Sequence, residues 1–251
     1  WIRKEMLRRE KDFTKMTTLS IWAGTWNVNG KKPSVDIREW LLPAGSSLKR
    51  AADVFLIGLQ EVQPLSGMSA VTTDPARGTV WKEGIERALD SPNTYVTIAA
   101  RQLVGILLVV LVKRTHEPFV RDLMITDAGT GFLGSGGNKG GVACRFALYD
   151  KTIACVSCHF AAHEHNTERR NQDFHDVVRK AIFRREPGAK SDPSPFSYLE
   201  YDRTSREAAG NVAHPMSILD HDAVFWTGDL NYRIQLPVDH ALEFIQRRKW
   251  E

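Results

Sequence analysis

Apolar residues gather in short runs that end at polar clusters, a pattern typical of buried strands leading into a site. The most apolar run, from Leu103 to Val112, is too short to cross a bilayer and is rich in β-branched residues. It therefore predicts a strand buried on both faces. Similar runs predict strands over 19–27, 53–61, 95–100, 103–113, 140–149 and 152–160, and a further run at 223–226 leads into the last polar cluster.

Apolar residues at helical spacing are found in fewer places. They predict a short helical segment near 38–42, helices over 80–89 and 167–185, and a last helix from Pro237 onward. One face of the 167–185 helix carries Phe174, Val177, Val178, Ala181 and Ile182. Strands outnumber helices, and no repeat of fixed period appears, so the pattern favours one α/β domain.

The composition is ordinary for a soluble globular protein and adds a preference for anionic partners. Of the 251 residues, 42% are hydrophobic and 25% charged, with a formal net charge of +4. This excess favours phosphates, nucleic acid or an anionic membrane face without choosing among them. Residues 1–16 are charged throughout and lack the apolar core of a signal peptide. We expect a basic helix or linker there and one folded domain over 17–251.

The three cysteines indicate a reducing compartment rather than a disulfide framework. Cys155 and Cys158 form a C-x-x-C pattern, but they lie within a predicted strand. Strand positions three apart face opposite sides, so the two thiols should not converge on a metal. We expect buried core cysteines.

Five polar clusters stand where the predicted strands begin or end. They are Trp26-Asn-Val-Asn-Gly30, Gln60-Glu61, Gly136-Gly-Asn-Lys-Gly-Gly141, Cys158-His-Phe-Ala-Ala-His163 and Asp229-Leu-Asn231. Polar groups at strand ends, backed by an apolar scaffold, are where α/β enzymes place their chemistry. The clusters therefore predict one composite site.

The segment 226–233, WTGDLNYR, is the most informative of these clusters. Residues two apart along an extended chain point to the same side, so Asp229 and Asn231 would project together if the strand continues. The carboxylate could orient a water, the amide could hold an anionic oxygen, and Arg233 adds a cation, as attack of water on a phosphate requires. The alternative is a strand that ends in an Asx turn, with Gly228 as the bend.

Glu61 ends an apolar strand, where a buried carboxylate needs a compensating partner. Mg²⁺ fits, since it takes few protein carboxylates and keeps waters and substrate oxygens, but an Arg or Lys would also serve. Asn27 and Asn29 repeat the spacing of Asp229 and Asn231; a simple turn before Gly30 is the alternative.

The remaining clusters offer cations and imidazoles. Glycines bracket Asn138 and Lys139, which would let the backbone approach a phosphate, although a plain hairpin loop has equal weight. His159 and His163 flank Phe-Ala-Ala, and a zinc site is the weaker alternative for them because no third ligand is well placed. The arginines of the 168–173 tract are either solvated or close a phosphate pocket.

Together these motifs resemble the inositol polyphosphate 5-phosphatase family, within the group of metal-dependent phosphatases and nucleases related to DNase I. The matching segments, in order, are TWNVNG (25–30), QE (60–61), GNKGGV (137–142), CHFAAH (158–163), ERRNQDF (168–174) and WTGDLNYR (226–233). GDLN alone would also fit related DNA-repair endonucleases, whereas the ordered set is more specific. The resemblance implies a four-layer α/β sandwich of two packed mixed sheets flanked by helices.

The resemblance also implies roles for individual residues. A metal would be held by Glu61 and Asn29. Catalytic roles fall to Asp229, which activates the attacking water, and to Asn27, Asn231, His159 and His163. Contacts with substrate phosphate fall to Asn138, Lys139, Arg170 and Arg233.

The implied activity is Mg²⁺-dependent removal of the 5-phosphate from phosphoinositides or soluble inositol polyphosphates by one-step, in-line attack of water. It implies a cytoplasmic, monomeric domain of a larger protein, peripheral at anionic membranes and without a nucleic-acid partner. Two alternatives remain: an apurinic-type endonuclease on the same scaffold, and a non-catalytic phosphoinositide-binding module. The family continues with P-x-W/Y-x-D-R-I/L and S-D-H motifs that are absent here, so we expect the C-terminal part of the fold to be missing.

Overall fold

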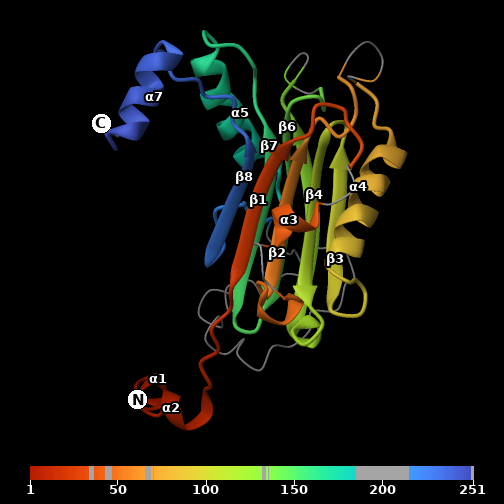
Figure 1. Cartoon of the computed structure of the whole chain (residues 1–251). Helices are drawn as coiled ribbons and strands as arrows, with labels where there is room; N and C mark the ends of the chain where they lie inside the picture. The colour runs from red at the N-terminus through yellow and green to blue at the C-terminus, as the bar shows by residue number, and fades with distance from the viewer. Residues whose placement is uncertain are drawn as a thin grey trace.

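The computed structural model describes the whole chain except residues 34–36, 43–46, 66–68, 70, 132–133, 135, 185–214 and 250–251. Two four-stranded sheets dominate it (Figure 1). The strands are β1 (Ile21–Asn27), β2 (Val54–Gln60), β3 (Tyr95–Leu103), β4 (Ile106–Lys113), β5 (Val120–Gly129), β6 (Gly140–Leu148), β7 (Lys151–His159) and β8 (Ala223–Asp229). The helices are α1 (Ile2–Arg8), α2 (Glu10–Phe13), α3 (Arg38–Leu41), α4 (Pro75–Ala88), α5 (Thr167–Lys180) and α7 (Val238–Gln246), with 3₁₀ turns η1 (Leu48–Arg50) and η3 (Glu117–Phe119).

The two sheets share one pattern of pairing. The first has the order β1-β2-β4-β3 and the second β5-β6-β7-β8. In each sheet one outer strand runs parallel to its neighbour, β1 with β2 and β8 with β7, and the other pairings are antiparallel. The carboxyl ends of both parallel pairs carry polar residues in register: Asn27 opposite Gln60, and His159 opposite Asp229.

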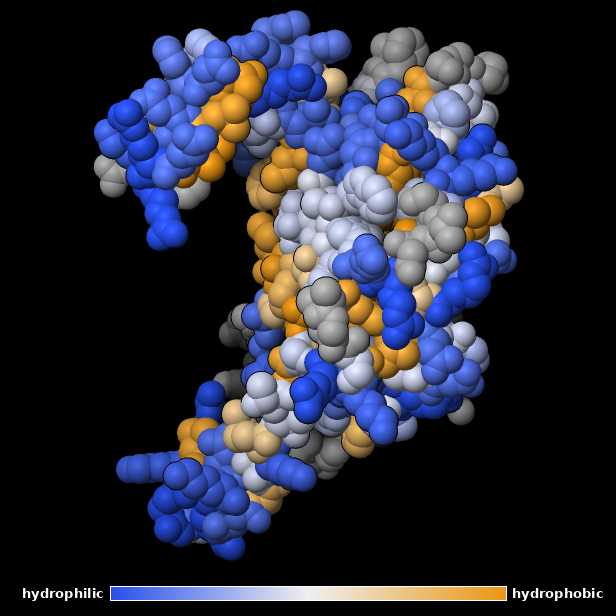
Figure 2. All heavy atoms as spheres, in the orientation of Figure 1, coloured by the Kyte–Doolittle hydropathy of each residue, from blue (hydrophilic) through white to orange (hydrophobic). Residues whose placement is uncertain are grey.

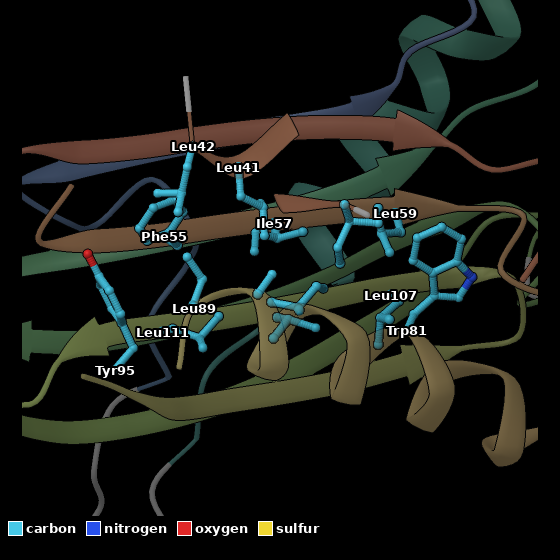
Figure 3. Packing of buried hydrophobic residues seen from close by; sticks show 14 of the residues in the cluster. Leu41, Leu42, Phe55, Ile57, Leu59, Trp81, Leu89, Tyr95, Leu107 and Leu111 are labelled. Atoms are coloured by element: carbon cyan, nitrogen blue, oxygen red, sulfur yellow. The ribbon is translucent and has the colours of Figure 1, made fainter. Parts of the chain in front are cut away.

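Three hydrophobic clusters separate four layers. Between the sheets, residues such as Leu56 and Val110 of the first sheet meet Phe146 and Cys155 of the second. On the outer face of the first sheet, α4 contributes Trp81, Ile85 and neighbouring residues to a cluster with β2 and β4 (Figure 3). On the outer face of the second sheet, α5 packs over β5 and β6 and shares a hydrophobic cluster with residues of β7. The predicted four-layer sandwich is confirmed, since this order is helix, sheet, sheet, helix.

The cysteines lie as the strand alternation predicts. Cys155 belongs to the cluster between the sheets, whereas Cys158 belongs to the cluster beneath α5, so the two thiols face opposite sides of β7. All three cysteines are buried and free. Burial raises the pKa of Cys158 to about 12, which keeps that side chain an unreactive thiol at neutral pH.

Several predicted boundaries were wrong. The helix expected from residue 80 begins at Pro75, where Asp74 caps the amide of Ala76; the Asp-Pro pair is a start signal that apolar spacing overlooks. The helix expected over 167–185 ends at Lys180, because Phe183 pairs with Met216 in an isolated bridge. Residue 185 lies outside the described part.

Strand β5 was not predicted at all. Its sequence, VRDLMITDAG, mixes charged and apolar residues without a buried run. It is an outer strand of the second sheet and most of its residues are only partly buried. An edge strand with one partner needs less apolar surface than a central strand, so it gives a weak pattern.

The opposite outer strand, β8, is also only partly buried along its whole length. Figure 2 shows apolar residues on this side of the body, between α7 and the N-terminal helices of Figure 1. Exposed apolar residues continue beyond β8: Leu230, Tyr232, Ile234, Leu236, Val238, Leu242, Phe244 and Ile245. In the part of the chain that the structure describes, no helix has the length and apolar character needed to span a membrane.

At Gly58 the first sheet leaves no room for a side chain against the second, which gives a testable prediction. A Cβ atom there would lie 2.7 Å from Thr227 Oγ1 and 2.8 Å from Ser157 Oγ. Gly58→Ala should therefore lower the free energy of unfolding by about 1–3 kcal/mol, as overpacking does, measured by urea unfolding. Gly84→Ala is the control, because its Cβ would meet Ile37 at an ordinary 3.5 Å and alanine favours the α4 helix. Equal stability of the two variants would contradict this account.

Candidate active site

One amide joins the two sheets at the ends of their parallel strands. Asn27 Nδ2, at the end of β1, donates to Glu61 Oε1 and to Asp229 Oδ2, both at 3.0 Å. Glu61 directly follows β2, and Asp229 ends β8. Parallel neighbours bring their carboxyl ends to the same edge, and face-to-face packing of β1 on β8 brings the two edges together. Two carboxylates thus share one donor, although Asn27 and Asp229 are 202 residues apart.

Strands β1 and β8, the outer members of the two parallel pairs, are followed by the same kind of turn. The backbone amide of Asn29 donates to Asn27 Oδ1 at 3.1 Å, and that of Asn231 donates to Asp229 Oδ1 at 3.0 Å. Asn29 and Asn231 have φ angles of 50° and 55°. These are Asx turns, in which asparagine tolerates the left-handed conformation. Of the two alternatives for this segment, the Asx turn is therefore confirmed, and Asp229 and Asn231 do not project together from one extended strand because β8 ends at Asp229.

Two further residues near the site have left-handed backbone. Glu61 has a φ of 56° and His163 a φ of 75°. Neither residue is glycine, and such conformations cost about 1–3 kcal/mol each unless the surroundings enforce them. The hydrogen bond from the Gly30 amide to the Glu61 carbonyl, at 2.7 Å, helps to fix the first. Nine non-glycine residues of the described part have a positive φ, and four of them, Asn29, Glu61, His163 and Asn231, lie at or beside this site.

His159 lies behind the two carboxylates and is almost fully buried. Its Nε2 is 2.6 Å from Lys139 Nζ, 3.7 Å from Asp229 Oδ2 and 3.9 Å from Glu61 Oε1. Burial, reinforced by Lys139 and opposed by Asp229, lowers the pKa of His159 to about 4. Burial also lowers the pKa of Lys139, while Asp229 and Glu61 oppose that effect. The neutral imidazole can therefore accept a hydrogen bond from the Lys139 ammonium group.

This pKa has a consequence for stability. An unfolded histidine titrates near pH 6.5, so between pH 6.5 and about 4 the unfolded chain binds the extra proton. The stability that depends on keeping His159 neutral is fully present above pH 6.5 and is lost as the pH falls to about 4. In EDTA, wild-type protein should lose more unfolding free energy between pH 7.5 and 5 than His159→Gln does. His240→Gln, a substitution on exposed α7, is the control and should lose as much unfolding free energy as the wild type. If His159→Gln also loses as much as the wild type, the lowered pKa does not belong to His159.

A hollow of about 360 Å³ opens beside Lys139. The predicted residues Asn138 and His163 line it together with Arg169. Asn138 Oδ1 itself is buried and has no hydrogen-bond partner among the described residues. His163 is exposed and stacks on His165 with ring centroids 6.0 Å apart. The structure thus places His163 in the hollow's wall and His159 beside the carboxylates.

Of the two predicted arginines, only Arg233 is accessible. It is exposed, and its Nη2 lies 3.4 Å from Asn231 Oδ1. Arg170 is 1% exposed, and its guanidinium group donates to the backbone of residues 161–164. The prediction that Arg170 contacts substrate phosphate does not fit this placement, because α5 turns the side chain inward, beneath the loop.

The donor set suits a hard divalent cation. Glu61 and Asp229 are oxygen ligands, both 29% exposed, that converge on one amide. The described residues contain no group of three or more His, Cys, Asp or Glu arranged to hold a metal. Mg²⁺ needs only one or two protein carboxylates because it keeps several waters, so this pair has the chemistry to hold such an ion. Asn29, the other predicted ligand, is exposed beside this pair and makes its turn contact through the backbone.

Two supporting residues escaped prediction as site residues. Gln60 bridges the sheets below the carboxylates, accepting from Thr25 Oγ1 at 3.1 Å and donating to Ser157 Oγ at 3.3 Å. Asp173 is fully buried and accepts from the Ala161 amide at 2.8 Å. The sequence offered one signal for each: Gln60 is a polar residue directly before Glu61, and Asp173 is an acid four positions after Arg169.

The chain also matches known proteins. A sequence profile described as "Endonuclease/Exonuclease/phosphatase family 2" matches residues 24–251. The chain belongs to this family. The predicted resemblance to the inositol polyphosphate 5-phosphatases is confirmed, because proteins named for that activity are among those that the chain resembles.

Two relatives illustrate the match within the family. The chain is 30% identical to synaptojanin-2 of Rattus norvegicus over 266 residues, covering 100% of this chain and 16% of that protein. It is 32% identical to the type II inositol 1,4,5-trisphosphate 5-phosphatase of Mus musculus over 251 residues, covering 100% of this chain and 22% of that protein. The chain therefore spans about a fifth or less of the length of these relatives.

Solved structures confirm the family fold. The inositol polyphosphate 5-phosphatase domain of SPsynaptojanin, in complex with inositol (1,4)-bisphosphate and calcium ion, superposes with a TM-score of 0.73 at 26% identity, over 98% of this chain and 62% of that one. A Cimex nitrophorin in a ferrous NO complex superposes with a TM-score of 0.52 at 18% identity, over 92% of this chain and 66% of that one. Since the fold also occurs in a nitrophorin, function must be argued from the site.

Proposed function

We propose that this chain carries the centre of a Mg²⁺-dependent phosphatase that removes the 5-phosphate from phosphoinositides or soluble inositol polyphosphates by in-line attack of water. The observation that carries this proposal is the amide of Asn27 shared by Glu61 and Asp229. It unites a metal-ligand carboxylate from one sheet with a water-orienting carboxylate from the other. Relatives named as 5-phosphatases support the reaction class.

Each residue of the site has a distinct task in this mechanism. Asp229 orients the attacking water and accepts its proton, while Asn27 fixes the position of that carboxylate. Lys139 and Arg233 place positive charge around the phosphoryl group as negative charge develops on it. Asn231 is held by the Phe160 carbonyl and presents its Oδ1 toward Arg233. Mg²⁺ bound at Glu61, with Asn29 nearby, would polarise the phosphoryl oxygens.

The substrate proposal follows from chemistry and from the relatives. The SPsynaptojanin domain holds inositol (1,4)-bisphosphate, the compound left when a 1,4,5-trisphosphate loses its 5-phosphate. In this chain, the hollow beside Lys139 offers Asn138 and His163 to a further phosphate on the ring. The calcium in that complex is, like Mg²⁺, a hard cation that prefers oxygen ligands. We propose Mg²⁺ as the working ion.

The cellular setting is part of the same proposal. The net charge of +4 favours an anionic membrane face, and buried free thiols suit the cytoplasm. We propose a monomeric catalytic domain that meets membranes peripherally, preceded by a basic helix or linker over 1–16, with 17–251 as the catalytic part.

The test is a substrate panel assayed with the full-length protein. Phosphate release should occur from inositides that carry a 5-phosphate and not from 3- or 4-monophosphates, with Mg²⁺ required and EDTA inhibiting. Nicking of abasic DNA, with binding that weakens steeply as salt rises, would instead identify an endonuclease. Vesicle binding without phosphate release under any divalent ion would identify a binding module.

A further inference from the structure

Arg170 is the largest fully buried side chain in the described part of the structure, yet it carries a permanent charge. It projects from the first turn of α5, and its two terminal nitrogens face the loop that links β7 to that helix. Nη1 lies 2.6 Å from the His163 carbonyl and 3.4 Å from that of Ala161. Nη2 lies 3.2 Å from the Glu164 carbonyl and 3.1 Å from Thr167 Oγ1.

A second loop covers the same guanidinium group. The ring of Tyr232 lies over Arg170, with the guanidinium carbon 5.1 Å from the ring centroid. The Tyr232 hydroxyl donates to Asn171 Oδ1, on the next residue of α5, at 2.5 Å. Tyr232 follows Asp229 and Asn231, so α5 holds the segment that carries the proposed water-orienting residue.

The two loops are also joined directly. Asn231 Nδ2 donates to the Phe160 carbonyl at 3.0 Å, and the Phe160 amide donates to the Asp229 carbonyl at 3.0 Å. Phe160 immediately follows His159. One side of the guanidinium group therefore fixes the loop after His159, while the aromatic contact fixes the loop after Asp229.

We propose that Arg170 is a positioning residue that locks the 161–164 loop against the 229–232 loop and so sets the place of Asp229 relative to His159. This role rests on the proposed phosphatase function for its catalytic consequence. Burial and the four oxygen contacts within the protein exclude a direct grip on substrate phosphate.

The chemistry of arginine suits this task. The planar fork presents several N–H groups in fixed directions, which can reach carbonyls of successive residues, and its flat face can stack under an aromatic ring. A lysine ammonium group has no planar fork and is more strongly hydrated. Replacing Arg170 with Lys should therefore keep the charge and lose the lock.

The first test separates positioning from substrate binding by steady-state kinetics on the full-length protein. Arg170→Met and Arg170→Lys should both lower kcat, on the order of 10²-fold, because small misplacements of reacting groups have effects of this size, while KM changes far less. Arg179→Met is the matched control: it lies on the same helix, but its side chain is 70% exposed and it should behave as wild type. A raised KM at unchanged kcat would show substrate contact and overturn the proposal.

Tyr232 supplies a second pair of variants that leave Arg170 and its four oxygen contacts in place. It is about half exposed, so its replacement is compatible with folding. Tyr232→Leu removes the ring above the guanidinium group and should lower kcat on the order of tenfold. Tyr232→Phe keeps the ring and should stay much closer to wild type. Equal activity of Tyr232→Leu and wild type would contradict the two-loop lock.

Hydrogen exchange provides a readout that needs no substrate. The amides of Ala161 and Asn166 are hydrogen-bonded within the loop, to Asp173 and to the His163 carbonyl. Their protection should fall in Arg170→Met and in Tyr232→Leu, and should persist in Arg179→Met. Unchanged protection would overturn the proposal whatever the activity. If the wild type releases no phosphate, the proposed function fails by itself, and exchange still decides whether Arg170 fixes the loop.

Discussion

Asp229→Asn should lower kcat by about 10²-fold or more, while KM changes little, because a general base acts chiefly in the transition state. The substitution keeps the shape of the side chain and its acceptor for the Asn231 amide, now 3.0 Å from Oδ1. It removes the negative charge and the proton acceptor at Oδ2. In addition, an amide nitrogen placed there would face Asn27 Nδ2, so two donors would meet.

The measurement is phosphate release at varied substrate concentration with saturating Mg²⁺. Asp150→Asn is the control, since Asp150 lies in the exposed turn between β6 and β7, at the other end of the second sheet. A rise in KM without loss of kcat would place Asp229 in substrate binding instead.

Glu61→Gln is expected to abolish Mg²⁺-dependent turnover and to leave the fold intact. Glutamine retains an acceptor for Asn27 Nδ2, which now lies 3.0 Å from Glu61 Oε1, so the bridge between the sheets can persist. What is lost is the charge that attracts the cation, and a neutral amide is a much poorer ligand for Mg²⁺.

Calorimetric titration with Mg²⁺ alone should show the loss of binding directly, and urea unfolding in EDTA should show that stability is retained. Glu117→Gln serves as the control because Glu117 lies in η3, with a side chain 42% exposed and paired with Arg114. Near-normal activity of Glu61→Gln, with an unaltered Mg²⁺ requirement, would mean that the ion is held elsewhere.

Strands with continuous burial were predictable from sequence, whereas the edge strand β5 was not. Every residue of β2 and all but the last of β4 are buried, and both strands are apolar up to their final residue, so the apolar run follows directly from the burial. β5 is partly or fully exposed along most of its length, and its sequence has no such apolar run. The turn at Asn231 illustrates a different limit: strand alternation and an Asx turn predict the same residue types, and only the backbone distinguishes them.

The members of the site were easier to predict than their tasks. Motifs at strand ends predict Asn27, Glu61 and Asp229 as site residues, and the structure brings these three together. The direction of Arg170 was unpredictable, since an arginine at the start of a helix faces a ligand or the protein according to how the preceding loop folds. His163 is a similar case: it lies four positions after His159, yet it lines the hollow while His159 is buried.

The position of the site at the seam of two sheets has a mechanical consequence. Glu61 and Asp229 belong to different sheets, so sliding one sheet over the other by about 1 Å would misalign the proposed metal ligand and the proposed water-orienting carboxylate, an error of a size that costs rate heavily. Gly58 and the Gln60–Ser157 hydrogen bond lie at the interface between the two sheets and oppose this sliding. Substitutions between the sheets, such as those at Gly58 or Ser157, should therefore lower turnover even though they touch neither substrate nor ion. The proposed catalysis would then depend on how rigidly the two sheets are held against each other.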